Sequence, residues 1–322
     1  MNCSKLGIFI LFADDTNIFI KGKNLADALK KANEVLKFVQ LYMRLNELHI
    51  NMTKCCFIHF DPRKRRNMLD DSSELLLQID GIPIKQVRST RFLGIIIDEK
   101  LSWNEHIEYL TKKLKCQVGA INRIKDCVPR DLHRDLYYTL FESHLSYCID
   151  VWGGVSSNKM NPLFVVQKKC LRILFGDKEK YLGKFATCAR CRPCNEQILG
   201  EQFYRKEPSK PLFMKNKIMT VQNIYNYHCF MEVLKILKFR TPISLFSEFN
   251  LSNRKETLLL TPSPGTDFIY KSSILWNSLR IKLNILDFSV KISCLKSKIK
   301  SLILSVQHSH HESEWSAQNF EL

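Results

Sequence analysis

Two adjacent carboxylates, Asp14 and Asp15, stand between two apolar runs and give the chain its clearest chemical signal. Residues 8–12 lead in and residues 18–20 lead away, which predicts a tight β-hairpin with both acids at or beside its tip. Like charges side by side repel, and Mg²⁺, which prefers oxygen ligands, would relieve that repulsion. A pair of such ions commonly serves phosphoryl transfer in polymerases and nucleases. The alternative is an acidic turn on a surface hairpin, because Asp is a common turn residue.

A helix after the hairpin would help to hold it in place. Asn24 is a candidate N-cap, since its side chain can accept a hydrogen bond from the first turn. Apolar residues then recur at three- and four-residue steps up to about Leu45, which predicts one continuous helix. Its apolar stripe should cover one face of a sheet.

Short strands are predicted after that helix. Residues 55–60 have the composition of a strand, and residues 75–79 and 82–84 predict two more around the turn pair Asp80-Gly81. Residues 91–97 predict a further strand. The first hundred residues are therefore expected to form a mixed α/β region.

From Trp103 onward the apolar spacing becomes helical. One stripe runs to Ile121, a second helix begins near Leu132, and Asn161 with Pro162 predicts the cap and first residue of a third helix. Basic residues lie mostly off these stripes. They are Lys112, Lys113, Lys115, Arg123, Lys168, Lys169 and Arg172. Their repetition indicates that these helices contact phosphates. The alternative for each residue is that it simply lies on a solvated helix face.

Four motifs, in order, resemble one family. Phe12-Ala13-Asp14-Asp15 resembles the catalytic hairpin of reverse transcriptases, and Asn51-x-x-Lys54 resembles the segment that follows it in the palm. Phe92-Leu93-Gly94 with Asp98, and the stretch at residues 101–107, are similar to the primer grip and thumb entry of non-LTR retrotransposon reverse transcriptases of the jockey-like kind. The resemblance continues through most of the chain.

The resemblance implies an α+β fold built from three parts. Residues 1–100 would form a truncated reverse-transcriptase palm, with the β-hairpin, short strands and a helix. Residues 101–180 would form a helical thumb-like domain, and residues 181–322 a mostly helical C-terminal region with a polar tail. Such a thumb would grip a template–primer duplex through the basic residues given above.

The resemblance also assigns roles at the hairpin. Asp14 and Asp15 would be catalytic ligands of Mg²⁺, and Lys54 would lie near the incoming nucleotide. The family usually has Thr after this lysine, where this chain has Cys55. The alternative for Lys54 is a solvated lysine at the end of a strand.

A palm of this family uses a third carboxylate, from a strand well before the hairpin. Thirteen residues precede Asp14, and none of them is acidic. We therefore expect the isolated chain to be inactive as an RNA-directed DNA polymerase, with exposed sheet edges and poor solubility. The alternatives are a non-catalytic basic nucleic-acid-binding protein derived from a mobile element, and a decayed product without a selected role.

Composition points to a polyanionic partner. The 322 residues carry a formal net charge of +17, and the sequence pI is near 9.3, so nucleic acid is the simplest expectation. No run approaches the length of a membrane span and no persuasive secretory signal is present, so we expect an intracellular protein, in the nucleus or the cytoplasm, with no membrane partner.

Three cysteines at two-residue gaps, Cys188, Cys191 and Cys194, raise the question of a metal site. Zinc requires four ligands, and no further pair of cysteines with this spacing is present elsewhere in the sequence. The alternative is a loop with reduced thiols, as is usual inside cells.

Overall fold

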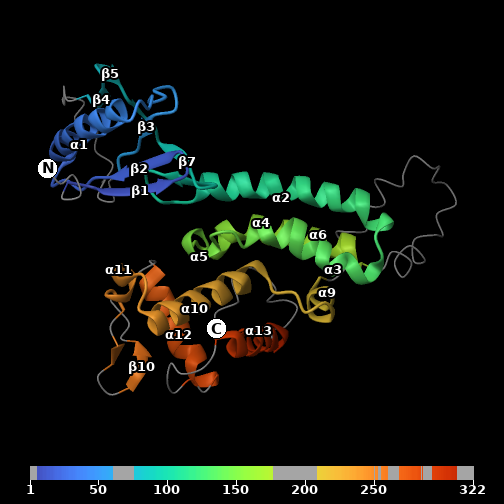
Figure 1. Cartoon of the computed structure of the whole chain (residues 1–322). Helices are drawn as coiled ribbons and strands as arrows, with labels where there is room; N and C mark the ends of the chain where they lie inside the picture. The colour runs from blue at the N-terminus through green and yellow to red at the C-terminus, as the bar shows by residue number, and fades with distance from the viewer. Residues whose placement is uncertain are drawn as a thin grey trace, which may run out of the picture. The chain divides into compact units, whose positions relative to one another are not determined.

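The computed structural model describes residues 6–60, 76–176, 209–249, 251–252, 255–259, 268–283, 285 and 292–309. The chain divides into two compact units, Met1–Ser102 and Trp103–Leu322. Figure 1 shows strands and one helix in the first unit and mainly helices in the second. The predicted mixture of helices and small sheets is therefore confirmed, while the assignment of palm and thumb stays a prediction.

The described residues of the first unit form one helix and four pairs of strands. Its elements are β1 (Ile8–Phe12), β2 (Asp15–Phe19), α1 (Leu25–Leu45), β3 (Cys56–Phe57), β4 (Gln78–Ile79), β5 (Ile82–Pro83), β6 (Lys85–Gln86), β7 (Ser89–Phe92) and β8 (Ile95–Asp98). Three pairs are antiparallel hairpins, β1–β2, β4–β5 and β7–β8, whereas β3 and β6 pair in parallel. Each of these sheets has two strands, so both edges of each remain open among the described residues.

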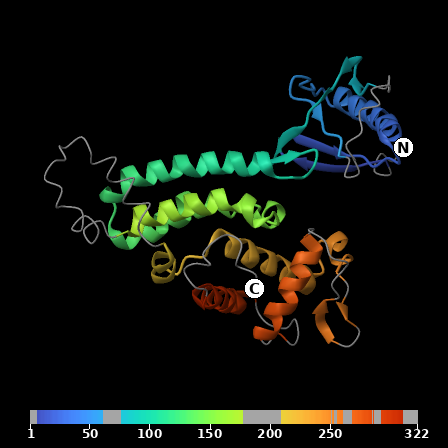
Figure 2. The same ribbon diagram turned by 180° about the vertical axis from the view of Figure 1, so that it is seen from behind.

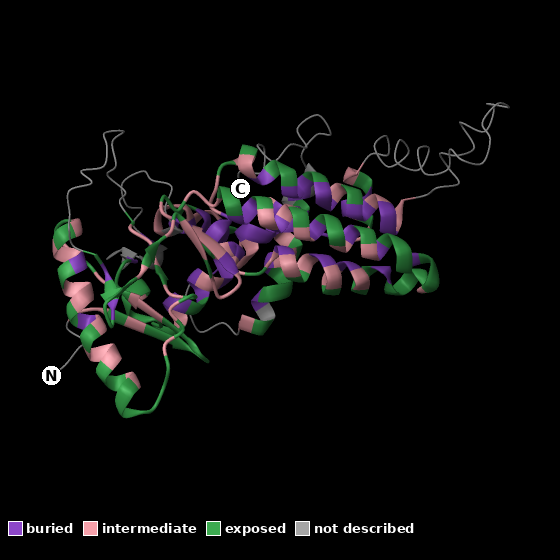
Figure 3. Cartoon of the chain, turned by 90° about the horizontal axis from the view of Figure 1, so that it is seen from above, coloured by how far each residue is buried: buried purple, intermediate pink, exposed green. Residues whose placement is uncertain are grey.

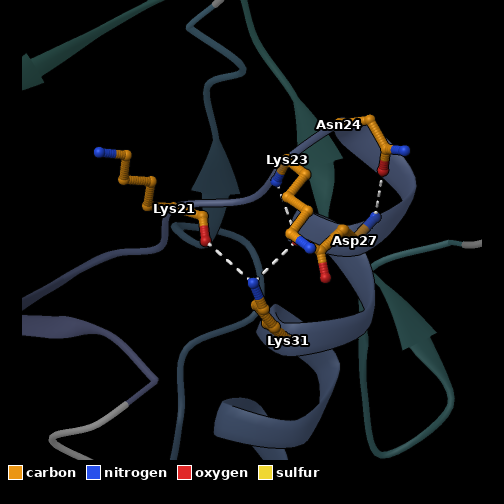
Figure 4. Close-up of polar contacts among 5 residues, drawn as sticks. All are labelled: Lys21, Lys23, Asn24, Asp27 and Lys31. Carbon is orange, nitrogen blue, oxygen red and sulfur yellow. Dashed lines mark hydrogen bonds and ion pairs between the residues drawn. The ribbon is translucent and has the colours of Figure 1, made fainter.

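Helix α1 begins where its sequence predicts. The Asn24 side chain accepts a hydrogen bond of 2.8 Å from the Asp27 backbone N–H (Figure 4). The Asp27 carboxylate in turn accepts from the Lys23 backbone N–H and from Lys31 Nζ, both at 2.8 Å. These bonds lower the pKa of Asp27, chiefly through Lys31. Asp27 therefore supports the first turn of α1 in its ionised form.

One strand prediction is wrong. Residues 91–97 do not form a single strand, because Leu93 and Gly94 turn the chain between β7 and β8 and bring Phe92 opposite Ile95. Both turn residues have positive φ, 44° at Leu93 and 88° at Gly94. Two-residue hairpin turns need this geometry because it matches the twist of the paired strands. The Phe-Leu-Gly motif is thus a hairpin turn.

Apolar side chains of the first unit remain widely exposed. Ile8 is 68% exposed, Leu11 69% and Phe12 61%, although all three belong to β1. Figure 3 shows this contrast, since the hairpin ribbons are mostly green, whereas purple recurs between pink and green along the long helices of the second unit. The hairpin therefore lacks the apolar cover that a strand of this composition normally receives.

The second unit is built around two long helices. Its elements are α2 (Asn104–Ile124), η2 (Lys125–Cys127), η3 (Arg130–Leu132), α3 (His133–Leu136), the π-helix η4 (Tyr137–Glu142), α4 (Ser143–Leu145), α5 (Ile149–Trp152), α6 (Ser157–Phe175), α9 (Lys210–Lys215), α10 (Val221–Phe239), α11 (Ile243–Phe246), β9 (Leu251–Ser252), β10 (Lys255–Leu259), α12 (Phe268–Lys282) and α13 (Ile292–Ser309). Helices α2 and α6 lie side by side in both side views (Figure 2).

Packing of α2 against α6 follows the predicted apolar stripe. The stripe residues of α2 are buried, and they are Ile107, Leu110, Leu114, Val118 and Ile121. The C-terminal ends of the two helices meet, since Lys125 Nζ donates to the Ile173 carbonyl at 3.4 Å and the His133 ring lies 2.9 Å from the Leu174 carbonyl. The two helices therefore run parallel.

The predicted start of the third helix is wrong. Helix α6 begins at Ser157, so Asn161 is not its cap and Pro162 lies inside the helix. Proline is tolerated near a helix start because the first four N–H groups have no partner within the helix. Pro162 is the sixth residue of α6, so only one early hydrogen bond is lost.

Two buried glutamines tie the C-terminal helices to α6. Gln167 donates from Nε2 to the Met219 carbonyl at 2.9 Å and to the Tyr137 hydroxyl at 2.8 Å. Its Oε1 accepts from the Val221 N–H at 2.9 Å. The Gln167 side chain is fully buried.

Gln307 of α13 binds the same backbone segment from the other side. Its Oε1 accepts from the Thr220 N–H at 3.0 Å and from Asn223 Nδ2 at 2.9 Å, and its Nε2 donates to the Ile218 carbonyl at 3.1 Å. The segment at residues 218–221 therefore has its polar backbone atoms satisfied by side chains on both sides. We call Gln167 and Gln307 the glutamine clamp.

The hydrogen bonds of the glutamine clamp predict an effect of Gln167 on the free energy of unfolding. Gln167→Met should lower the free energy of unfolding by roughly 2–4 kcal/mol, because it leaves buried N–H, carbonyl and hydroxyl groups without partners. Chemical denaturation measures this change. Lys169→Met, on the exposed side of the same helix, is the matched control and should change it by less than about 0.5 kcal/mol. Equal effects of the two substitutions would contradict the clamp.

Candidate metal hairpin and nucleic-acid interface

The hairpin tip is tight and strained. Phe12 and Asp15 are paired, so Ala13 and Asp14 form the two-residue turn between β1 and β2. Ala13 has a φ of 50°, in the left-handed region where a Cβ atom is unfavourable. A residue held in this way costs on the order of 1 kcal/mol, and such strain is concentrated at functional sites.

Both carboxylates at this tip are exposed to solvent. Neither is hydrogen-bonded or ion-paired with another described residue, so their oxygen atoms are available to a ligand. Their chemistry fits Mg²⁺, which takes carboxylate oxygens. Within the described parts of the chain, no group of three or more His, Cys, Asp or Glu residues is arranged to hold a metal ion. The hairpin therefore presents two exposed carboxylates, Asp14 and Asp15, and their role as Mg²⁺ ligands stays a prediction.

Lys54 is positioned by a turn that Asn51 stabilises. The Asn51 side chain accepts from the Thr53 N–H at 3.1 Å and from the Thr53 hydroxyl at 2.6 Å, while the Lys54 N–H donates to the Asn51 carbonyl. This is an Asx-type turn, and it accounts for an asparagine three residues before the lysine. Lys54 is exposed just before β3.

The structure does not join Lys54 to the acidic tip. No hydrogen bond or ion pair links Lys54 to Asp14 or Asp15 among the described residues. The far end of the hairpin is anchored instead, because the rings of Phe19 and Phe92 meet edge to face at 6.5 Å. This contact holds β2 against β7, the strand that carries the Phe-Leu-Gly turn.

The four basic residues predicted on α2 differ in their surroundings. Lys115 and Arg123 are exposed. Lys112 is exposed too, but its Nζ forms an ion pair of 2.7 Å with Glu108 one turn earlier. Lys113 is half-buried and lies near His144, where its charge adds to burial in lowering the pKa of that histidine. Lys115 and Arg123 are therefore the α2 cations best placed for an external anion.

On α6, Lys169 is exposed, whereas Lys168 and Arg172 are half-buried. Lys168 Nζ lies 4.5 Å from the centre of the Phe164 ring. Burial lowers the pKa of Lys168, and the charge of Arg172 lowers it further. The ammonium group of Lys168 therefore lies over the Phe164 ring in a cation–π contact within its own helix.

His106 is part of an aromatic cluster in the core. Its ring lies 5.4 Å from Trp152 and 6.5 Å from Trp103, and the residue is 3% exposed. Burial lowers the pKa of His106 to about 4. His106 is therefore part of the packed core of the second unit.

Sequence reasoning missed two cations that meet at one tyrosine. Arg134 and Lys300 both lie against the ring of Tyr138, at 5.6 Å and 5.0 Å from its centre. The spacing of Arg134 and Tyr138, four residues apart in consecutive helical segments, was a local signal that could have been used. Nothing in the sequence indicated Lys300, which is 162 residues away from Tyr138.

Comparison with curated proteins finds retrotransposon polymerases. The chain is 24% identical over 170 residues to the RNA-directed DNA polymerase from mobile element jockey of Drosophila melanogaster, and 24% identical over 168 residues to that of Drosophila funebris. It is 19% identical over 170 residues to the probable RNA-directed DNA polymerase from transposon X-element of Drosophila melanogaster. About half of this chain is related to jockey-like non-LTR retrotransposon reverse transcriptases. The resemblance carried by the motifs is thereby confirmed.

These matches cover 51% of this chain and 18% of the length of each of the three relatives. No protein-family model matches the chain, and no solved structure matches it. The described helices include none that is long and apolar enough to cross a lipid bilayer. The three cysteines at positions 188, 191 and 194 lie outside the described residues.

Burial of the His106 imidazole predicts that the free energy of unfolding depends on pH. The unfolded chain takes up a proton on His106 near pH 6.5, whereas the folded chain resists protonation down to about pH 4. This contribution is fully present above pH 6.5 and is lost as the pH falls toward 4. Unfolding free energies at several pH values should show a smaller acid loss for His106→Gln than for wild type.

The control for this comparison is His49→Gln, which removes an exposed histidine. It should keep the wild-type pH profile. Glu142 acts in the opposite direction, because burial raises its pKa to about 7, so the difference between variant and wild type isolates His106. Identical profiles for wild type and His106→Gln would contradict the assignment.

Proposed function

We propose that this chain is a reverse-transcriptase-derived region that binds a template–primer duplex through its helical unit. The similarity to RNA-directed DNA polymerases of jockey-like elements is the observation that carries the proposal. The net charge of +17 supports it, because a duplex offers a dense line of phosphates. Lys115 and Arg123 on α2 and Lys169 on α6 are the exposed cations that would contact them.

The parallel packing of α2 and α6 supports this assignment physically. Their apolar faces are buried against each other, so their basic side chains must point away from the shared core. Contacts of this kind fix a protein on nucleic acid without reading its sequence, since phosphates are the same at every position. A polymerase requires a grip of that type, because it must move along any template.

The β1–β2 hairpin would serve the chemical step. Asp14 and Asp15 would hold Mg²⁺, which when bound would neutralise phosphate charge and polarise the attacked phosphorus. Lys54 would approach the phosphates of an incoming nucleotide from the start of β3. The strain at Ala13 supports a functional tip, because the turn fixes the two carboxylates on a rigid hairpin.

We further propose that the chain by itself does not extend a primer. Two-metal transfer of a nucleotide needs several carboxylates around both ions, and the hairpin supplies Asp14 and Asp15. Two exposed ligands bind a single Mg²⁺ weakly, since the remaining positions are filled by water. Binding of nucleic acid and catalysis are therefore separable in this chain.

Duplex binding should depend on salt through the helical unit. The double variant Lys115→Gln, Lys169→Gln should bind a short DNA duplex more weakly than wild type and reduce the slope of log K against log salt by about 1.8, as expected for two lost phosphate contacts. Fluorescence anisotropy over a range of NaCl concentrations measures both. Lys30→Gln with Lys37→Gln, two exposed lysines of α1, removes equal charge and should leave the slope unchanged.

Primer extension tests the hairpin. With Mg²⁺, an annealed template–primer and nucleoside triphosphates, the isolated chain should add no nucleotide, because its hairpin supplies too few metal ligands. Denaturing gel electrophoresis of a labelled primer is the measurement. If the chain extends the primer and Asp14→Asn abolishes this activity, the proposal of inactivity is wrong and Asp14 is catalytic in this chain.

A further inference from the structure

The C-terminal ends of α2 and α6 are joined by two buried side chains, His133 and Lys125. His133 is 7% exposed and Lys125 is 4% exposed, which is unusual for a lysine. His133 begins α3, which follows α2 through the short segments η2 and η3 and packs against α6 (Figure 1). Polar contacts at this point therefore tie the end of α2 to a helix that lies much further along the chain.

The His133 ring bridges the two helix ends. Its Nδ1 atom lies 2.9 Å from the Leu174 carbonyl oxygen of α6, and its Nε2 atom lies 2.9 Å from the Lys125 carbonyl oxygen, directly after α2. Lys125 adds a second link, since its Nζ atom donates to the Ile173 carbonyl at 3.4 Å. The last carbonyls of a helix have no partner within it. These two side chains therefore cap α6 with groups that α2 and α3 hold in place.

Burial makes this bridge costly to break. The Phe175 ring lies 6.5 Å from the His133 ring, and both bridging side chains are shielded from water. Parallel helices also place two negative dipole ends side by side, and the ammonium group of Lys125 offsets this charge. If α6 slipped along α2, buried donors and acceptors would lose their partners, which is strongly unfavourable.

Apolar packing alone selects a register less sharply. The buried stripe of α2 repeats at three- and four-residue steps, so similar contacts recur when one helix shifts by a turn, about 5.4 Å. In coiled coils, a single buried polar residue selects one register among such alternatives. The bridge has the same property, because α6 offers its carbonyl oxygens to side chains only at its end.

Register matters for the cations of the proposed duplex grip. Arg123 lies two residues before Lys125, Lys169 lies five residues before Leu174, and both cations are exposed. At about 1.5 Å per residue, they lie about 3 Å and about 7.5 Å along the helix axes from the bridged ends. Phosphates of one strand follow each other at about 3.4 Å along a duplex axis. A slip of one turn exceeds this spacing, so register decides whether both cations meet phosphates together.

We propose that His133, together with Lys125, fixes the register of α6 on α2. His133 is then a positioning residue of the duplex grip, because the register sets the spacing of Arg123 and Lys169. It does not contact a phosphate itself. The inference rests on the proposed function, since it concerns the same cations, and it adds the residue that holds them at a fixed spacing.

Two amide substitutions separate the two sides of the bridge. The side-chain nitrogen of Asn takes the place of Nδ1, so His133→Asn keeps a donor toward Leu174 of α6. The side-chain nitrogen of Gln takes the place of Nε2, so His133→Gln keeps a donor toward Lys125 and loses the link to α6. The two variants are equally polar and differ in which helix the side chain can hold.

Duplex binding by the full chain is measured by fluorescence anisotropy over a range of NaCl concentrations. His133→Gln should reduce the slope of log K against log salt by about 0.9, as expected for one lost phosphate contact. His133→Asn should keep the wild-type slope. Gln167→Met is the control for stability, since it weakens the contacts of α6 away from the bridge, and it should also keep the slope. Circular dichroism sets a temperature at which every variant is folded.

A second measurement reports the register without nucleic acid. Spin labels on genetically encoded residues replace the exposed Asn122 of α2 and Asn161 of α6, and pulsed electron resonance gives the distance between them. Wild type and His133→Asn should show one narrow distribution of distances. His133→Gln should show a second population, because α6 can then occupy a register displaced by about one turn, or about 5.4 Å.

Three results would overturn the inference. Equal slopes for His133→Gln and His133→Asn would show that the link to α6 does not position the cations. An equal loss of slope in Gln167→Met would show that the slope follows stability. A single unchanged distance in His133→Gln would show that the bridge does not fix the register. Failure of the proposed function looks different, since wild type would then bind no duplex at any salt concentration, while the label distances would still report the register.

Discussion

The glutamine clamp is the interaction on which the second unit depends. Gln167 on α6 and Gln307 on α13 bind the backbone of residues 218–221 from two sides, and both are fully buried. A buried polar backbone segment without such partners would be strongly unfavourable. Because these two side chains satisfy it, the segment can run through the interior and bring the C-terminal helices against α6.

Two surfaces follow from that arrangement. The parallel pair α2 and α6 buries its apolar faces and leaves Lys115, Arg123 and Lys169 exposed. Docking of α13 brings Lys300 to Tyr138, which no local contact could do. The clamp also fixes η4, because the Tyr137 hydroxyl accepts from Gln167. Stability of the core and the placement of surface charge thus depend on the same few side chains.

The hairpin of the first unit is held by different means. Its tip relies on a strained Ala13, and its far end on the contact between Phe19 and Phe92. Apolar residues of β1 stay exposed, so the described part of this unit contributes little burial around the two carboxylates. The carboxylates are therefore exposed to solvent, and water and salt screen the repulsion between them.

Local signals in the sequence predicted local structure well. The cap at Asn24, the length of α1, the turn at Asp80-Gly81 and the buried stripe of α2 are all present as predicted. Each depends on a few neighbouring residues, so spacing and residue type suffice to predict it. The motif at residues 12–15 likewise predicted a hairpin, which the structure contains.

The structural features that the sequence did not predict have a common physical cause. The Phe92-Leu93-Gly94 run has apolar strand composition, and only its backbone geometry, with Leu93 at positive φ, reveals a turn. The start of α6 was placed at Asn161 because proline usually marks a first turn, yet tertiary packing extends the helix back to Ser157. Gln167 and Lys300 act through residues far away in sequence, and the helical period carries no information about such partners.

The most direct test of the account is a footprint of lysine reactivity on the full chain, with and without a template–primer duplex. Brief acetylation followed by peptide mass spectrometry reports each lysine separately. The account predicts that duplex protects Lys115 and Lys169 and leaves Lys30 and Lys37 of α1 unchanged. Uniform protection of all four lysines, or protection confined to α1, would contradict a duplex grip built on α2 and α6.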